Sequence, residues 1–236
     1  MPRLFKTLFL LPAALLSLFA DEQIVLVLSD DFNTTTAQLQ RYELRDGKYT
    51  LAGSELTVNL GRSGLGWGLG SEAVKHKRRE PVKQEGDGRA PAGIFALQQS
   101  FGYAPSIQTA MPYLQVDRET ICVDDVDSAA YNTIISPDKS ERPKSFEWMK
   151  RDDALYEIGV TVAHNQTQEY RAGSCIFLHI QKADASPTAG CTSMTKEALA
   201  DIIAWLDPQK KPLLVQIPKI YCGEIEKRFN GVECSQ

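Results

Sequence analysis

Residues 175–180, Cys-Ile-Phe-Leu-His-Ile, carry the pattern that decides the fold class. The stretch is short, apolar, and contains β-branched and aromatic residues, which is typical of a buried β-strand. Similar stretches lie on both sides of it in the chain and are bounded by turn-forming residues. We therefore expect strands in the ranges 24–28, 41–45, 48–51, 55–60, 94–97, 113–116, 159–163, 175–180 and 213–217.

Turn and helix signals complete this pattern. Asp46-Gly47 supplies the positive φ angles of a tight hairpin between two of the strands. One helix is indicated by Thr195 as its cap and by an apolar face that ends before Asp207-Pro208. A second, weaker helix is expected over 145–155. Many strands, few helices and no βαβ alternation predict a mainly β, sandwich or barrel-like domain with one or two helices.

The N-terminal segment has the composition of a secretory signal. Residues 1–20 begin with Arg3 and Lys6, continue with an apolar core, and end at the small residue Ala20. The apolar run is too short to span a hydrocarbon core of ~30 Å comfortably. We therefore expect an exported protein of the periplasm or cell envelope, with one domain over residues 21–236 and no membrane span after cleavage.

Composition and charge exclude several classes of function. The 236 residues are 43% hydrophobic and 24% charged, which is the balance of a globular domain. The chain carries 26 Lys and Arg against 30 Asp and Glu, a net charge of −4. Loss of the two basic residues of the signal would make it −6. Nucleic-acid binding needs a basic surface, so we expect no nucleic-acid partner.

Five cysteines invite disulfide pairing in an exported protein: Cys122, Cys175, Cys191, Cys222 and Cys234. An odd number leaves at least one thiol without an intramolecular partner. Cys222 and Cys234 are close in sequence, so a small loop-closing bridge between them is one expectation. The pairing of the cysteines is otherwise open.

A histidine and a cysteine near the central strand form the candidate for catalysis. His179 lies at the strand end, and Cys191 follows Gly190 shortly before the predicted helix. A catalytic cysteine needs a neighbouring base, which imidazole supplies near neutral pH. Glycine beside the nucleophile allows close backbone approach to an oxyanion. By spacing alone, a buried structural cysteine and a hydrogen-bonded core histidine explain these residues equally well.

Two motifs resemble those of the L,D-transpeptidase family with the YkuD-type catalytic domain. The first is Cys175-Ile-Phe-Leu-His179 followed by Thr188-Ala-Gly-Cys-Thr-Ser-Met194, which is similar to the family's histidine, variable loop and Ser/Thr-x-Gly-Cys. The second, Gly86-Asp-Gly-Arg-Ala-Pro-Ala-Gly-Ile-Phe95, resembles an upstream segment of the family. Both occur in the family's order. The resemblance implies a mainly β, YkuD-like catalytic domain.

The resemblance also implies a reaction on peptidoglycan stem peptides. Cys191 would be the nucleophile and His179 its base. The carbonyl of Ile180 would orient the imidazole, and the amides of Gly190 and Cys191 would hold the oxyanion. Cys191 would attack the bond between a diamino acid and a terminal D-Ala to form a thioester. An amine then accepts the acyl group in a transpeptidase, or water accepts it in an L,D-carboxypeptidase.

The sequence departs from the commonest family pattern at two positions. Ala189 stands where many members have a second histidine, and Ser193 stands where many have arginine or asparagine. These changes leave transfer and hydrolysis both open, because they affect how the acceptor is held. Thr188, Ser193 and His164 are candidate substrate-binding residues. A histidine satisfied by backbone groups is the alternative for His164.

No metal or cofactor is expected. The three histidines lie far apart in sequence, and no zinc-binding motif is present. The glycine-rich segment 64–70 lacks dinucleotide-binding spacing and is expected to be a flexible loop in which Trp67 anchors packing. A function of another class, a non-catalytic wall-binding module, predicts that Cys191 is held in a disulfide, for instance with Cys175.

Overall fold

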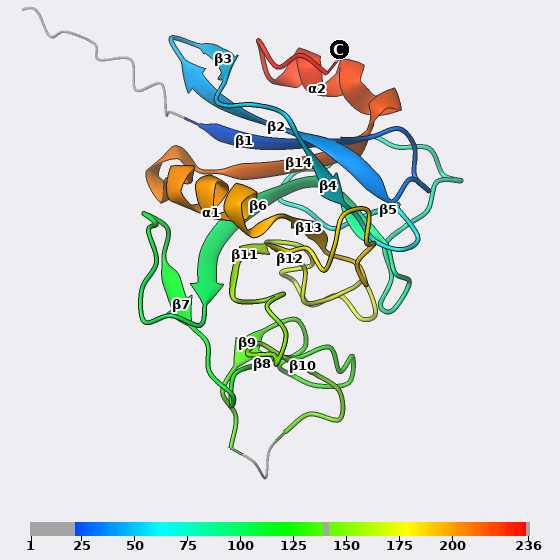
Figure 1. Cartoon of the computed structure of the whole chain (residues 1–236). Coiled ribbons are helices and arrows are strands. Elements are labelled where there is room, and N and C mark those ends of the chain that lie inside the picture. Colours follow the sequence, from blue (N-terminus) through cyan, green and yellow to red (C-terminus); the bar gives the residue numbers. More distant parts are fainter. Residues whose placement is uncertain (1–21, 139–141, 235–236) are drawn as a thin grey trace, which may run out of the picture.

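The computed structural model describes residues 22–138 and 142–234, which form a mainly β protein with two α-helices (Figure 1). This confirms the predicted fold class. The predicted signal, residues 1–20, lies outside the described residues. The large sheet contains β1 (Gln23–Ser29), β2 (Thr36–Arg45), β3 (Lys48–Leu51), β4 (Leu56–Asn59), β5 (Leu65–Trp67), β6 (Ala90–Gly102), β7 (Tyr113–Gln115), β11 (Ile158–Val162), β12 (Phe177–Ile180), β13 (Thr192–Met194) and β14 (Leu213–Pro218).

Eight of these strands close into a barrel-like ring. Their order is β1-β14-β6-β11-β12-β13-β4-β2, and β2 pairs with β1 to complete the ring. All residues of β1 are buried, and β1 pairs with β14 on one side and with β2 on the other. Closing the ring satisfies the backbone groups that an open sheet would leave at its edges. The predicted strand ranges all overlap observed strands.

The Asp46-Gly47 hairpin and the first helix are also confirmed. Asp46 and Gly47 have φ angles of 51° and 77°, and they join β2 to β3. Helix α1 (Lys196–Trp205) begins after Thr195, whose side chain accepts a hydrogen bond from the Ala198 amide. The apolar face of α1 packs into the same core as the barrel strands. A short 3-10 turn, Pro208–Lys210, follows α1.

Two sequence expectations about secondary structure are wrong. Residues 145–155 form no α-helix, because 147–148 pair with β8 as a short strand, β10 (Glu147–Trp148), between turns. The second helix is instead α2 (Cys222–Arg228), which follows the 3-10 turn Lys219–Tyr221. The segment 64–70 is not a flexible loop throughout, because it contains β5, which pairs in parallel with β6. Trp67 is buried in the core as expected.

A second, smaller sheet lies beside the barrel, at the end opposite α2 (Figure 1). It consists of β8 (Ile121–Cys122) between β9 (Ile134–Ile135) and β10. A disulfide joins Cys122 of β8 to Cys175, just before β12. The small sheet is therefore covalently attached to the strand that carries His179. Within residues 22–138 and 142–234, no helix has the length and apolarity needed to cross a bilayer.

The expected disulfide between Cys222 and Cys234 is also not formed. Cys222 and Cys234 are separate thiols, so the predicted bridge between them is absent from the structure. The thiol of each lies about 4 Å from the other's backbone carbonyl, with Sγ–O distances of 4.0 and 3.9 Å. Cys191 is a free thiol, and Cys175 is bonded to Cys122. The pairing of Cys175 with Cys191 that a non-catalytic module would allow is therefore not formed.

Candidate functional site

Two neighbouring parallel strands bring the predicted nucleophile and base to one cavity. His179 of β12 is in register with Ser193 of β13, and Cys191 precedes Ser193 by two residues. Residues in register on neighbouring strands point to the same face, so His179 and Ser193 share one face of this strand pair, and Cys191 immediately precedes β13. Cys191 and His179 both line a cavity of about 370 Å³.

The thiol of Cys191 is buried and bonded to the backbone before β12. Cys191 is only 7% exposed. Sγ accepts a hydrogen bond from the Phe177 amide at 3.3 Å and donates to the Cys175 carbonyl at 3.5 Å. Burial, followed by the charge of Glu147, raises the pKa of the Cys191 thiol to about 12. At neutral pH the unliganded site therefore holds a protonated thiol.

His179 is held in one orientation, and its Nε2 has no hydrogen-bond partner among the described residues. Nδ1 lies 2.8 Å from the Ile180 carbonyl oxygen. A carbonyl only accepts, so Nδ1 carries the proton, and the neutral ring keeps its lone pair on Nε2. The imidazole packs edge-on against Tyr156, with 5.3 Å between the ring centroids. Burial lowers the pKa of His179 to about 4, so the ring is neutral at physiological pH.

The turn before Cys191 is closed by its own hydrogen bonds. The Gly190 amide donates to Thr188 Oγ1 at 3.1 Å, and that hydroxyl donates to the Cys191 carbonyl at 2.6 Å. A Cβ on Gly190 would lie 3.1 Å from the Arg89 carbonyl oxygen, which explains the need for glycine. Thr188 thus shapes the turn, and its hydroxyl occupies the Gly190 amide that was predicted to hold the oxyanion.

The other two predicted binding residues lie in different surroundings. Ser193 lines the cavity, is 1% exposed, and its hydroxyl has no hydrogen-bond partner among the described residues. His164 does not line this cavity but a neighbouring one of about 490 Å³. Its Nε2 lies 2.9 Å from the Ala172 carbonyl, and its Nδ1 accepts from the Leu69 amide at 3.2 Å. His164 is therefore satisfied by backbone groups on both nitrogens.

The small sheet contributes an acidic part of the cavity wall. Glu147 of β10 and Asp124, which follows β8, both line the cavity, together with Glu85. Glu147 accepts a hydrogen bond from the Tyr156 hydroxyl at 2.7 Å. Burial raises the pKa of Glu147, and the nearby negative charge of Asp124 raises it further. One carboxylate oxygen of Asp124 is enclosed without a hydrogen-bond partner in the described part of the chain.

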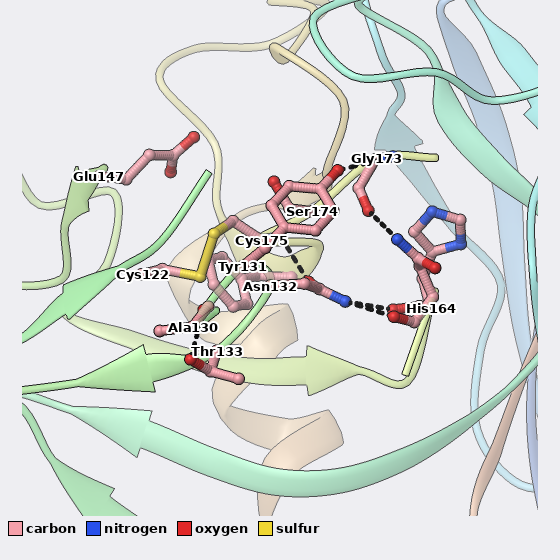
Figure 2. The surroundings of a disulfide bond; sticks show 12 residues. Cys122, Ala130, Tyr131, Asn132, Thr133, Glu147, His164, Gly173, Ser174 and Cys175 are labelled. Carbon is pink, nitrogen blue, oxygen red and sulfur yellow. Dashed lines mark hydrogen bonds between the residues drawn. A yellow bond between two sulfur atoms is a disulfide. The ribbon is translucent and has the colours of Figure 1, made fainter. Parts of the chain in front are cut away.

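The disulfide fixes this wall against the barrel, as Figure 2 shows. Asn132 bridges the two parts beside it. Its Oδ1 accepts from the Cys175 amide at 3.0 Å, and its Nδ2 donates to the His164 carbonyl at 2.8 Å. The Cys175 carbonyl also accepts a hydrogen bond from the Cys191 thiol, so a cysteine of the disulfide directly contacts the predicted nucleophile.

Several residues of the cavity were not predicted from the sequence. Glu147 lies in a stretch that we interpreted as helix, and Tyr156 lies just beyond it. Lys83, which also lines the cavity, precedes the Gly86-Asp87 motif by a few residues. Lys83 forms an ion pair with Asp87, but its burial is visible only in the structure, so no sequence signal identified it. No group of three or more side chains suited to holding a metal ion occurs among residues 22–138 and 142–234.

Comparisons with family models and with curated proteins find no match for this chain. Solved structures similar to it include the helical cell shape determining protein Pgp2 from Campylobacter jejuni, with 14% identity and a TM-score of 0.41. The match covers 89% of this chain and 57% of that one. A point mutant of Pgp2 matches with 16% identity and a TM-score of 0.39, covering 85% and 47% of the two chains. The chain thus spans about half the length of these proteins.

Proposed function

We propose that the protein is an exported cysteine acyltransferase of peptidoglycan metabolism that acts in the periplasm or cell envelope. Its substrates would be peptidoglycan stem peptides, cut at the bond between the diamino acid and D-Ala. The observation that supports this most directly is the cavity that Cys191, just before β13, shares with His179 of the neighbouring strand β12. The motif resemblance supplies the substrate class.

The protonation states define the order of events. The unliganded site holds a neutral thiol and a neutral imidazole, because burial raises the pKa of Cys191 and lowers that of His179. Proton transfer from Cys191 Sγ to His179 Nε2 would therefore accompany attack on the peptide carbonyl rather than precede it. The sulfur–carbon bond forms, the carbon–nitrogen bond breaks, and the imidazolium returns the proton to the departing D-Ala amine.

The second half of the reaction restores the enzyme. An amine of another stem peptide, or water, attacks the thioester carbonyl and transfers a proton to His179. The carbon–sulfur bond breaks, and the imidazolium returns a proton to the Cys191 sulfur. An amine acceptor makes a cross-link, and water makes a tripeptide. The same two residues serve both outcomes.

The test is the conversion of purified disaccharide-tetrapeptide by the mature protein, analysed by chromatography and mass spectrometry. We expect dimers lacking one D-Ala, and no product from Cys191→Ala with an unchanged melting temperature. Tripeptide monomers without dimers would replace the transpeptidase by an L,D-carboxypeptidase. Product formation by Cys191→Ala, or no product from the wild-type protein, would contradict the proposed enzyme.

A further inference from the structure

Lys83 is a buried cation in the wall of the candidate site. The residue is 5% exposed and lines the cavity that holds Cys191. Its Nζ donates to Asp87 Oδ1 at 2.7 Å and to the Gln84 carbonyl at 2.6 Å. A lysine is rarely buried to this extent without a paired charge, and Asp87 supplies that charge.

The Gly86–Gly88 turn holds this lysine in place. Asp87 accepts hydrogen bonds from the Gln84 amide at 2.8 Å and from the Arg89 amide at 2.9 Å, in addition to the Lys83 ammonium. The carboxylate therefore organises the turn and binds the lysine at the same time. This explains an aspartate in the upstream motif in physical terms, since it places a positive charge beside the cavity.

The ammonium lies next to the nucleophile's turn. A Cβ built on Gly190 would be 3.9 Å from Lys83 Nζ, and Gly190 directly precedes Cys191. Gly173, which precedes the disulfide cysteine by two residues, would place a Cβ 3.0 Å from Lys83 Cε. Glycine at both positions leaves room for the lysine side chain to reach the cavity.

The ammonium has one donor left. It carries three N–H groups, and two of them are bonded to Asp87 and Gln84. No further partner for Nζ occurs among the described residues. An anionic group in the cavity is the ligand that the third N–H fits, because the hydrogen bond would be charge-assisted.

We propose that Lys83 binds the C-terminal carboxylate of the donor peptide and so restricts the enzyme to peptides with a free C-terminus. This inference rests on the proposed function. In such a donor one residue separates the attacked carbonyl from the terminal carboxylate, a span of about 3.8 Å between Cα atoms. A Cβ built on Gly190, the residue that precedes Cys191, would lie 3.9 Å from Lys83 Nζ, so the ammonium is close to the turn where the attacked carbonyl would bind.

Other cations of the cavity are less suited to this task. Arg151 is already bound to both carboxylate oxygens of Asp153, each at 2.9 Å. Arg62 and Lys182 also line the cavity, but both are exposed, so water screens their charges. The acidic part of the wall around Glu147 repels a carboxylate. Lys83 therefore combines burial, fixed position and a free donor.

The experiment compares two probes, disaccharide-tetrapeptide with a free C-terminal carboxylate and the same compound with a C-terminal amide. Binding is measured by calorimetry to Cys191→Ala, which cannot form the thioester. We expect the free acid to bind about tenfold to a hundredfold more tightly, the usual range for a hydrogen bond to a charged group. Lys83→Met in the same background should bring the ratio close to one.

Control variants keep the result interpretable. Lys83→Met leaves Asp87 unpaired, so Lys83→Met/Asp87→Asn removes the whole ion pair and should abolish the preference as well. Lys182→Met is the matched control and should keep the wild-type ratio. Circular dichroism verifies that each variant is folded.

The outcomes separate the inference from the proposed function. A wild-type enzyme that cleaves the acid and the amide equally well, or a folded Lys83 variant that keeps the preference, would overturn the role of Lys83 and leave the function intact. Equal losses of kcat for both probes in Lys83→Met, with equal binding, would assign Lys83 to the oxyanion instead and also overturn the proposal. Absence of both binding and cleavage in the wild-type background would overturn the function and this inference together.

Discussion

His164 and His179 occupy nearly the same electrostatic environment but differ in their hydrogen bonds. Each is buried, with 1% and 7% of its surface exposed, and burial lowers the pKa of each to about 4. His164 carries its proton on Nε2 and accepts the Leu69 amide at Nδ1, so both nitrogens are bonded. His179 carries its proton on Nδ1, and its Nε2 has no partner in the described structure.

The two rings therefore show that burial and pKa alone do not distinguish the proposed catalytic base from a histidine held by backbone groups. Both rings are neutral at pH 7 and both follow or lie within a strand of the barrel. Only the unbonded nitrogen of His179 is available to take a proton from another group. The backbone bonds of His164 instead join the segments around Leu69 and Ala172, which is a structural role.

The largest expected effect comes from replacing each histidine with alanine. His179→Ala should lower kcat/KM on the tetrapeptide by about 10²- to 10⁴-fold, because general-base assistance is lost. His164→Ala should instead destabilise the fold by about 2 to 4 kcal/mol, because two buried backbone groups lose their partner. The measurements are steady-state kinetics and urea unfolding on both variants.

Each variant is the control for the other. His164→Ala is expected to keep its activity per folded molecule to within a few-fold at low temperature. If His164→Ala lost activity as severely as His179→Ala while remaining folded, the distinction between the two rings would be wrong.

A smaller effect is expected from pH, which should change the free energy of unfolding through both histidines. Both histidines are neutral in the native state down to about pH 4, whereas an unfolded histidine binds a proton near pH 6.5. The unfolded state therefore binds more protons between these values, and the free energy of unfolding falls as the pH drops from about 6.5 to 4. Each ring contributes up to about 3 kcal/mol to this loss.

The pH dependence of kcat/KM should distinguish His179 from His164, whereas the pH dependence of unfolding should not. Urea unfolding at several pH values should show a shallower loss for either single alanine variant than for the wild type. The acid decline of kcat/KM, near pH 4, should remain unchanged in His164→Ala, since only protonation of His179 removes the base. A shift of that decline in His164→Ala would argue against the separate roles.

The smallest effect concerns Glu147, which acts on Cys191 and not on His164. The negative charge of Glu147 raises the pKa of the Cys191 thiol, so Glu147→Gln should lower it. We expect iodoacetamide to alkylate Cys191 about threefold to tenfold faster at pH 8 in this variant. Peptide mapping assigns the modified thiol.

Glu157→Gln is the matched control for this measurement. Glu157 is bonded to Lys196 on the surface, at 2.6 Å, and does not line the cavity with Cys191. Its alkylation rate should equal that of the wild type. Equal rates in Glu147→Gln and Glu157→Gln would show that Glu147 does not influence the thiol.

Most strands and the first helix could be predicted because each depends on a few residues that are adjacent in sequence. The apolar run of β1, the Asp46-Gly47 turn and the Thr195 cap each depend on a few neighbouring residues. The helix prediction for 145–155 was wrong because pairing with β8, more than 20 residues away in sequence, decides the structure of this stretch. Tertiary pairing of this kind overrides helix propensity.

The candidate site was predicted only where motif residues form it. Cys191, His179 and Ser193 were found from one segment, and the structure brings them to the same cavity. Glu147 and Lys83 come from other segments, and nothing in their immediate sequence places them beside Cys191. The partner of Cys175 likewise depends on how the small sheet docks, which spacing does not encode.

The disulfide between Cys122 and Cys175 makes the stability of the cavity wall depend on the redox conditions around the protein. It crosslinks the small sheet, which supplies Asp124 and Glu147, to the barrel strand that carries His179. Closing a loop of this length restricts the unfolded chain by about 4 kcal/mol in the chain-entropy picture. In a compartment where glutathione keeps thiols reduced, the acidic wall would be held by non-covalent contacts alone. Oxidation therefore stabilises the finished cavity, so a newly made chain gains this part of its stability only in an oxidising environment.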